Sequence, residues 1–115
     1  MRDKALQGWI EQHLEHARLV FILDDELGTH HGLSWADFVL LTMLDSAGGA
    51  APATALARIL HTPASHLLIG LLPLEKTGLV ERAADRDGKR CVTLRSQGRR
   101  LLHEARQTAA NVFAP

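Results

Sequence analysis

A change of hydrophobic pattern at Gly78 is the feature that most restricts how this chain can fold. Leu67, Leu71 and Leu74 recur at spacings of four and three residues, which is typical of one face of a helix. A short strand pattern at residues 79–82 follows Gly78 directly. Because glycine readily adopts the left-handed conformation that ends many helices, the chain is predicted to pass from helix to strand at this residue without a loop.

A shorter helix is expected immediately before this one, over residues 52–60. Its buried side is expected to consist of Leu56, Ile59 and Leu60. Thr62 is expected to cap the following helix, with Pro63 in the first turn. Since His61 and Thr62 alone separate the two segments, the sequence predicts a helix-turn-helix.

A hairpin and a last helix are expected after the helix-turn-helix. Residues 79–82 and 91–94 have strand character, and the polar stretch between them has Asp-Gly near its middle. This pattern predicts a hairpin with a charged tip at residues 83–90. Ser96 is expected to cap a helix that runs to Phe113.

The N-terminal part of the chain is predicted to form two helices. Apolar residues at helical spacing run through residues 4–27, and Gly28 is expected to end that helix. At 1.5 Å per residue the helix would be roughly 35 Å long, so part of it is expected to contact another subunit. Ser34 is expected to begin a helix over residues 35–46, with Asp37 completing an acidic variant of the capping box.

The composition is that of one domain with segregated charge. The 115 residues carry 13 basic and 13 acidic side chains, but the acidic ones dominate residues 1–45 and the basic ones the second half. A basic face is therefore expected on a protein of zero net charge. Apolar stretches are much shorter than the roughly 20 residues of a membrane span and a signal-peptide pattern is lacking, which predicts a cytoplasmic protein. Cys91, the single cysteine, is expected to be a structural thiol.

The segment around Gly78 also resembles a known family. Residues 74–82 read Leu-Glu-Lys-Thr-Gly-Leu-Val-Glu-Arg and are similar to the Leu-Glu-x-x-Gly-Leu-Val-x-Arg junction of MarR-type regulators. Residues 92–94 and Gly98 are similar to the family's Val-x-Leu-Thr-x-x-Gly motif. The residues that match its Asp/Arg-rich wing are Asp85, Asp87 and Arg90. The resemblance covers about residues 33–102.

This resemblance implies a mainly helical winged helix-turn-helix fold with a small β-hairpin wing. One domain would span residues 1–115, with N- and C-terminal dimerisation helices at about 4–27 and 96–113. A DNA-binding lobe would occupy about 34–95, including a wing at 79–95. The function implied is that of a homodimeric transcriptional regulator. Its two recognition helices would enter successive major grooves of double-stranded DNA, about 34 Å apart, and so select a pseudo-palindromic site.

The expected DNA contacts lie on the wing and on the helix that carries Leu67, Leu71 and Leu74, the fourth expected helix in chain order. The candidate residues are Ser65, His66, Ile69, Arg82, Arg86, Lys89 and Arg90. Arg86 and Arg90 are expected to reach phosphates or the adjacent minor groove. Arg82 is expected to brace the wing by pairing with Asp85 or Asp87. The alternative is that the charged hairpin is a solvated turn.

The fourth helix also supports a second hypothesis, because its outer side is apolar. Leu68, Ile69 and Leu72 are expected to face wholly or partly outward. Pro73 is expected to kink or end the helix near Leu72. An exposed apolar stripe more often marks a contact surface than a groove reader. The alternative function is therefore a diverged winged helix protein that binds a protein partner through this helix and has lost specific DNA reading.

Other classes of function receive less support. Trp9 and Trp35 are either core residues or the walls of an effector pocket, in which the resemblance implies that a small aromatic anion modulates DNA binding. The seven histidines include no His-x-x-x-His pair, so no metal is predicted. Catalytic constellations and glycine-rich phosphate loops with supporting context are missing from the sequence. Neither enzymatic activity nor a cofactor is expected.

Overall fold

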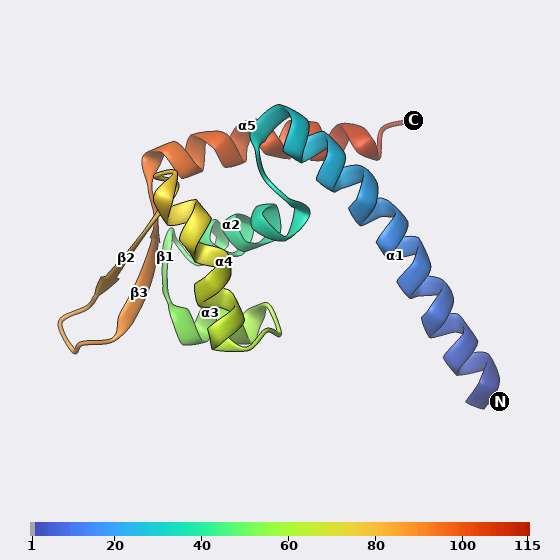
Figure 1. Cartoon of the computed structure of the whole chain (residues 1–115), viewed down its shortest axis with the longest axis horizontal. Coiled ribbons are helices and arrows are strands. Elements are labelled where there is room, and N and C mark those ends of the chain that lie inside the picture. The colour runs from blue at the N-terminus through green and yellow to red at the C-terminus, as the bar shows by residue number, and fades with distance from the viewer. Residues whose placement is uncertain (1) are drawn as a thin grey trace.

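The computed structural model describes residues 2–115, which form five helices and one three-stranded antiparallel sheet (Figure 1). The elements are α1 (Arg2–His31), α2 (Trp35–Ser46), β1 (Ala50–Pro52), α3 (Ala53–Ile59), α4 (Ala64–Lys76), β2 (Val80–Ala84), β3 (Arg90–Leu94) and α5 (Ser96–Val112). The predicted fold class, a mainly helical winged helix-turn-helix with a hairpin wing, is confirmed.

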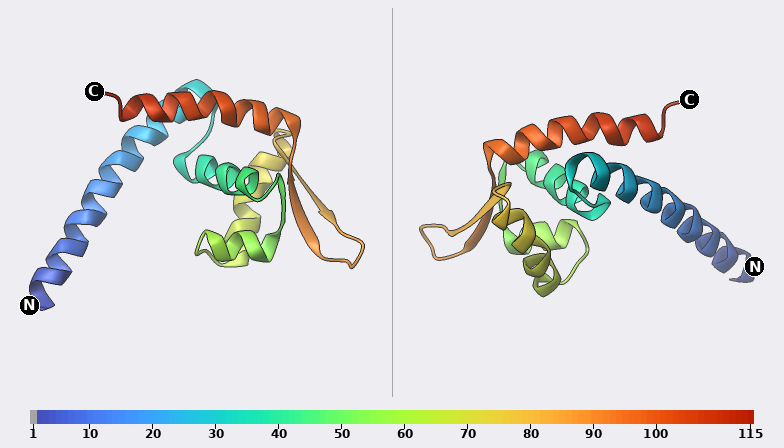
Figure 2. Two further views of the ribbon diagram at one scale, coloured as in Figure 1. Left: turned by 180° about the vertical axis from the view of Figure 1, so that it is seen from behind. Right: turned by 45° about the horizontal axis from the view of Figure 1, so that its top comes forward.

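α1 is longer than predicted and projects away from the rest of the molecule (Figures 1 and 2). The predicted end at Gly28 is wrong, because the helix continues to His31. Gly32, with φ of 69°, ends it instead, and the amide of Leu33 closes the last turn on the carbonyl of Leu27. A glycine inside a helix costs about 1 kcal/mol relative to alanine, and the burial of Leu27 in the core offsets that cost.

α2 has the predicted bounds and the predicted capping box. The Ser34 hydroxyl accepts a hydrogen bond from the Asp37 amide at 3.0 Å, and the Asp37 carboxylate accepts one from the Ser34 amide at 3.0 Å. Asp24 of α1 accepts a further hydrogen bond from the Trp35 amide at 2.7 Å. The amides of the N-cap residue and of two residues in the first turn of α2 are thereby satisfied, and the helix is attached to α1 at its start.

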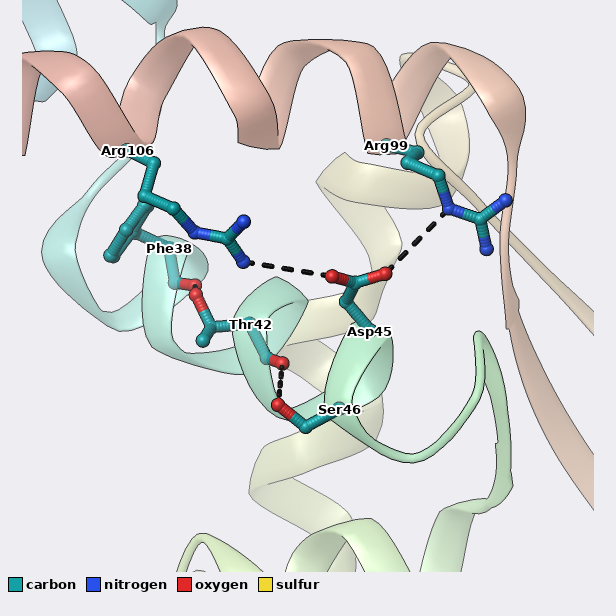
Figure 3. A network of polar contacts seen from close by, with 6 residues as sticks. All are labelled: Phe38, Thr42, Asp45, Ser46, Arg99 and Arg106. Carbon is teal, nitrogen blue, oxygen red and sulfur yellow. Dashed lines mark hydrogen bonds and ion pairs between the residues drawn. The ribbon is translucent and has the colours of Figure 1, made fainter.

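α5 lies across α1 and α2 at the top of the molecule (Figure 1). Asp45 of α2 lies between two guanidinium groups of α5, 3.6 Å from Arg99 and 3.6 Å from Arg106 (Figure 3). The expected cap at Ser96 is wrong by one residue, since Arg95 occupies the N-cap position. The Arg95 amide donates to the carbonyl of Leu79 at 2.9 Å, which holds this residue extended at the end of β3.

The sheet contains one strand that the sequence patterns did not reveal. β1 pairs with β3, which also pairs with β2, so the strand order is β1-β3-β2. β1 has three residues, Ala-Ala-Pro, too few to show an alternating hydrophobic pattern. Its pairing attaches β3 to the segment that leads into α3.

The core is built mainly of leucines contributed by every helix. Its fully buried large side chains are Leu23, Leu27, Leu41, Leu44, Leu56, Leu71, Leu102, Val80 and Val92. Within residues 2–115, no single helix is long and apolar enough to span a membrane. α3 and α4 reach the necessary hydropathy together, but they are bent by 106° relative to each other.

Candidate nucleic-acid interface

The predicted helix-turn-helix is formed by α3 and α4. The turn contains His61, whose φ of 52° is left-handed, and the Thr62 amide donates to the Ala57 carbonyl at 3.0 Å. The expected cap at Thr62 is wrong, because Pro63 occupies the N-cap position of α4. Ile59 was expected in the core but is half exposed, since α3 ends there and buries the face formed by Leu56 and the neighbouring alanines.

α4 has the two faces that its sequence predicts. Leu67, Leu71 and Leu74 are buried. The opposite stripe is exposed and consists of Ser65, Ile69, Leu72, Pro73 and Lys76. His66 is also exposed, so all three predicted contact residues of this helix, Ser65, His66 and Ile69, are accessible from outside.

The helix does not end near Leu72, one of the two effects expected of Pro73, because α4 continues to Lys76. Pro73 removes the amide that would have bonded to the Ile69 carbonyl. Both residues are exposed, so water can hydrate that carbonyl. The Thr77 amide and hydroxyl donate to the Pro73 carbonyl at 3.1 and 2.9 Å, which stabilises the turn that follows the proline.

The junction at Gly78 has the predicted left-handed conformation, with φ of 82°. The amides of Gly78 and Leu79 donate to the carbonyls of Glu75 and Leu74, which is the paired hydrogen bonding of a Schellman motif. Gly98 of α5 packs on this junction so closely that a Cβ atom there would overlap the Leu79 carbonyl oxygen. The two glycines of the family motifs therefore meet at one point, where α4, the wing and α5 are joined.

Arg82 does not pair with Asp85 or Asp87 as expected. Its guanidinium reaches back from β2 to Glu75 on α4, with Nε 3.1 Å from Oε2 and Nη2 3.0 Å from Oε1. These hydrogen bonds are the main reason why the pKa of Glu75 is lowered and that of Arg82 is raised. Because this bidentate pair uses two of its donors, Arg82 braces the wing against α4.

The wing tip is an ordered turn organised by Asp85. Its carboxylate accepts hydrogen bonds from the amides of Asp87 and Lys89 at 2.9 and 2.8 Å, and Gly88 has φ of 80°. The predicted contact residues Arg86, Lys89 and Arg90 are all exposed on this hairpin. The tip therefore presents a cluster of cationic side chains on a backbone of defined shape.

Arg58 is a basic residue that sequence reasoning missed. It lies near the end of α3 and lines a recess of about 510 Å³ together with Lys89 and Arg90 of the wing. Ala64 and Leu68 of α4 form another wall of the same recess. The sequence offered no signal for this arrangement, because the wing and α3 are about 30 residues apart in the chain. The recess brings cations from the helix-turn-helix and the wing to one place.

The two tryptophans of the expected effector pocket do not lie together in one chain. Trp9 is 72% exposed on the projecting part of α1, whereas Trp35 starts α2 and stacks on Phe38 with ring centroids 5.5 Å apart. Trp35 also lines a recess of about 340 Å³ with Leu60 and His66. Asp24 of α1 accepts the hydrogen bond from the Trp35 amide. Trp9 lies 15 residues before Asp24 on the same helix, which corresponds to about 22 Å.

The histidines and Cys91 occupy separate positions. His31 of α1 is 2.7 Å from the Thr108 hydroxyl of α5, and His30 is 3.5 Å from Glu26. Among residues 2–115, no three histidine, cysteine, aspartate or glutamate side chains are grouped closely enough to hold a metal ion. Cys91 lies on the second strand of the hairpin, β3, as predicted, and is half-buried there.

Comparison with known proteins identifies the fold. No family model matches the sequence, and no curated protein matches it either. The regulator BldR from Sulfolobus solfataricus matches with a TM-score of 0.87 and 24% identity, over 96% of this chain and 80% of that one.

Two further solved structures have a similar fold. A probable transcriptional regulator from Pseudomonas aeruginosa matches with a TM-score of 0.78 and 26% identity, over 91% of this chain and 77% of that one. A mutant of MarR from E. coli complexed with operator DNA matches with a TM-score of 0.81 and 18% identity, over 92% of this chain and 76% of that one. The resemblance expected from residues 74–82 and 92–98 is therefore confirmed, and the chain has the winged helix-turn-helix fold of the MarR-family transcriptional regulators.

Proposed function

We propose that the chain is a dimeric, DNA-binding transcriptional regulator of MarR type. The observation that carries the proposal is the basic wing, in which an Asp85-centred turn holds Arg86, Lys89 and Arg90 exposed. The ion pair between Arg82 and Glu75 joins this wing to α4. Cationic side chains on a fixed hairpin beside a helix-turn-helix suit the phosphates and minor groove that flank a recognition helix.

Dimerisation completes this proposal, because one helix-turn-helix reads half of a pseudo-palindromic site. The support is the projecting part of α1, which exposes five large apolar side chains. They are Leu6, Trp9, Ile10, Leu14 and Phe21. Several large apolar side chains exposed on one helix mark an interaction site, and a second copy of the chain has the matching helix.

A gel shift with DNA from upstream of the protein's own gene tests the wing. The Arg86→Ala/Arg90→Ala variant is expected to bind at least a hundredfold more weakly, because a dimer loses four charge-assisted hydrogen bonds of about 1.5–3 kcal/mol each, not fully additive. The slope of log affinity against log salt concentration should also fall, by about one for each phosphate that is no longer neutralised.

The matched control removes two exposed cations far from the wing, Arg2 and Lys4 at the start of α1. The Arg2→Ala/Lys4→Ala variant should keep the affinity and salt slope of the wild type. Equal binding by the wing variant and the wild type would refute the role of the wing.

Binding of a protein partner through α4 is the second candidate function. The observation that favours it is the 65% exposure of Ile69, an isoleucine on a surface helix. Affinity purification that returns a stoichiometric partner, with binding lost in Ile69→Asp and kept in Ile59→Asp, would favour this function. Sequence-specific DNA binding that is lost in Ile69→Asp would exclude this second function.

We also propose a small aromatic ligand that modulates DNA binding, with Trp35 at its site. The support is the recess that Trp35 lines beside α4, which is large enough for a single aromatic ring with its substituent. In a Trp9→Phe protein the fluorescence reports Trp35 alone. Quenching by benzoate, with weaker DNA binding at the same benzoate concentration, is the expected result. Unchanged fluorescence would remove this part of the proposal.

A further inference from the structure

We propose that α4 recognises DNA chiefly through the C5-methyl groups of thymines, which its exposed apolar stripe contacts in the major groove. This inference rests on the proposed DNA-binding function and adds the chemistry by which sequence is read. It assigns Ile69 and Leu72 as the specificity-determining residues, with Ser65 at the start of the same stripe.

The first argument is the geometry of the stripe. Ser65, Ile69, Leu72 and Lys76 follow one another at spacings of four, three and four residues, so they lie along one side of α4. Ile69 is 65% exposed and Leu72 is 51% exposed. This side lies opposite the buried Leu67, Leu71 and Leu74 and is therefore the side that a groove would meet.

The second argument is the chemistry that the stripe can offer to base edges. Residues 64–74 contain no arginine, lysine, asparagine or glutamine, the side chains that make bidentate hydrogen bonds to guanine or adenine. Glu75, at the end of α4, is paired with Arg82. In the major groove, thymine differs from the other bases by an apolar group, its methyl, and aliphatic side chains contact that group. Ile69 and Leu72 thus match thymine and no other base.

The third argument identifies DNA as the occupant of this apolar face. Arg58, Lys89 and Arg90 line one recess with Leu68 and Ala64, at the flank of α4. Lys76 closes the other end of the stripe. The apolar strip is therefore bordered by cations from α3, the wing and the end of α4. Phosphates border the apolar methyl groups of a major groove in the same way.

The test begins with selection of a preferred site from a pool of duplexes with a random central region. The wild-type protein then binds the enriched duplex and a copy in which deoxyuridine replaces each thymine, so that the methyl groups alone are removed. Each contacted methyl is expected to contribute about fourfold to affinity. A dimer that contacts two methyl groups in each half-site should therefore bind the deoxyuridine duplex more than a hundredfold less tightly.

Variants connect the methyl groups to the stripe. In Ile69→Ala, and in Leu72→Ala, the ratio of affinities for the thymine and deoxyuridine duplexes should fall several-fold, because the side chain that senses the methyl is absent. Both side chains are largely exposed, so these variants should fold. Ile59→Ala removes a half-exposed isoleucine from α3 and should leave the ratio unchanged.

The outcomes separate this inference from the proposed function. Tight, salt-dependent binding to the duplex pool with equal affinity for the thymine and deoxyuridine forms would overturn the thymine reading while leaving the DNA-binding function intact. The same holds for a thymine preference that Ile69→Ala and Leu72→Ala leave unchanged. Failure to bind any duplex would overturn the proposed function itself and leave the apolar stripe to a protein partner.

Discussion

The guanidinium of Arg82 on β2 holds the carboxylate of Glu75 on α4 by two hydrogen bonds of 3.1 and 3.0 Å. The pair crosses the Gly78 junction, where the backbone passes directly from helix to strand. It therefore connects α4 to the wing, the two elements that are proposed to contact DNA together. The family motif at residues 74–82 begins at Leu74, next to Glu75, and ends at Arg82.

Replacing Glu75 by glutamine should make stability depend less on pH. The pKa of Glu75 is lowered in the folded protein, mainly by the hydrogen bonds from Arg82. A lowered pKa stabilises the fold above the ordinary value of about 4.3, and that stabilisation is lost as the pH falls through the folded pKa. The melting temperature of the wild type should therefore exceed that of Glu75→Gln at pH 7, and the difference should shrink below pH 4. Glu81→Gln removes one negative charge from the neighbouring strand β2 and serves as the control for the loss of charge.

Gly98→Ala should destabilise the protein more than any other exchange of glycine for alanine within a helix. Its Cβ would overlap the Leu79 carbonyl and lie 2.8 Å from the Leu94 side chain, so the junction of α4, the wing and α5 must move apart. A loss of about 3 kcal/mol in the free energy of unfolding is expected, at the upper end of overpacking effects.

Gly70 supplies the opposite result for comparison. It lies inside α4, and a Cβ there has open space within 4 Å. Gly70→Ala should therefore stabilise the protein by up to about 1 kcal/mol through helix propensity. Urea unfolding measures both changes. A Gly98→Ala protein as stable as the wild type would show that the close packing on Leu79 is not required.

Much of the fold could be predicted because its signals are local. The Ser34 and Asp37 capping box sets the start of α2, and the leucine spacing of α4 sets its buried face. Gly78 sets the junction with the wing, since few other residues adopt its backbone conformation. Each of these signals lies within a few residues of the structure that it determines.

The features that were missed depend on interactions between distant segments. Arg82 has acidic residues close by in the wing, yet it pairs with Glu75 because the junction folds β2 back toward α4. Arg58 joins the wing cations through the packing of α3 against the sheet. Gly28 was expected to end α1, but the helix continues to His31, whose side chain contacts Thr108 of α5. Sequence spacing carries no information about such neighbours.

Asp45 should contribute little to stability despite its two arginine partners. Its distances to Arg99 and Arg106 are both 3.6 Å, and the two arginine side chains are more than half exposed (Figure 3). Exposed ion pairs of this kind contribute about 0–1 kcal/mol and are screened by salt. Asp45→Asn should therefore lower the free energy of unfolding by less than about 1 kcal/mol, with a smaller effect in 1 M NaCl. A loss of 2 kcal/mol would indicate a tighter network in solution.

The exposed apolar side chains of α1 should control the association of two chains. Trp9 and Phe21 are 72% and 78% exposed in the isolated chain. Aromatic residues bury about 150–250 Å² each in an interface, which at about 25 cal/mol per Å² corresponds to several kcal/mol per subunit. Trp9→Asp/Phe21→Asp should raise the dimer dissociation constant at least a thousandfold, as measured by sedimentation equilibrium.

A control on the same helix separates the effect of added charge from that of removed apolar area. His16 is a polar, exposed residue between the two aromatic positions, and His16→Asp adds one negative charge while leaving the apolar side chains in place. This variant should remain dimeric. DNA binding should fall together with dimerisation in the double variant, because one chain contacts half of a two-fold site. A wild-type protein that sediments as a monomer at micromolar concentration would refute the proposed dimer.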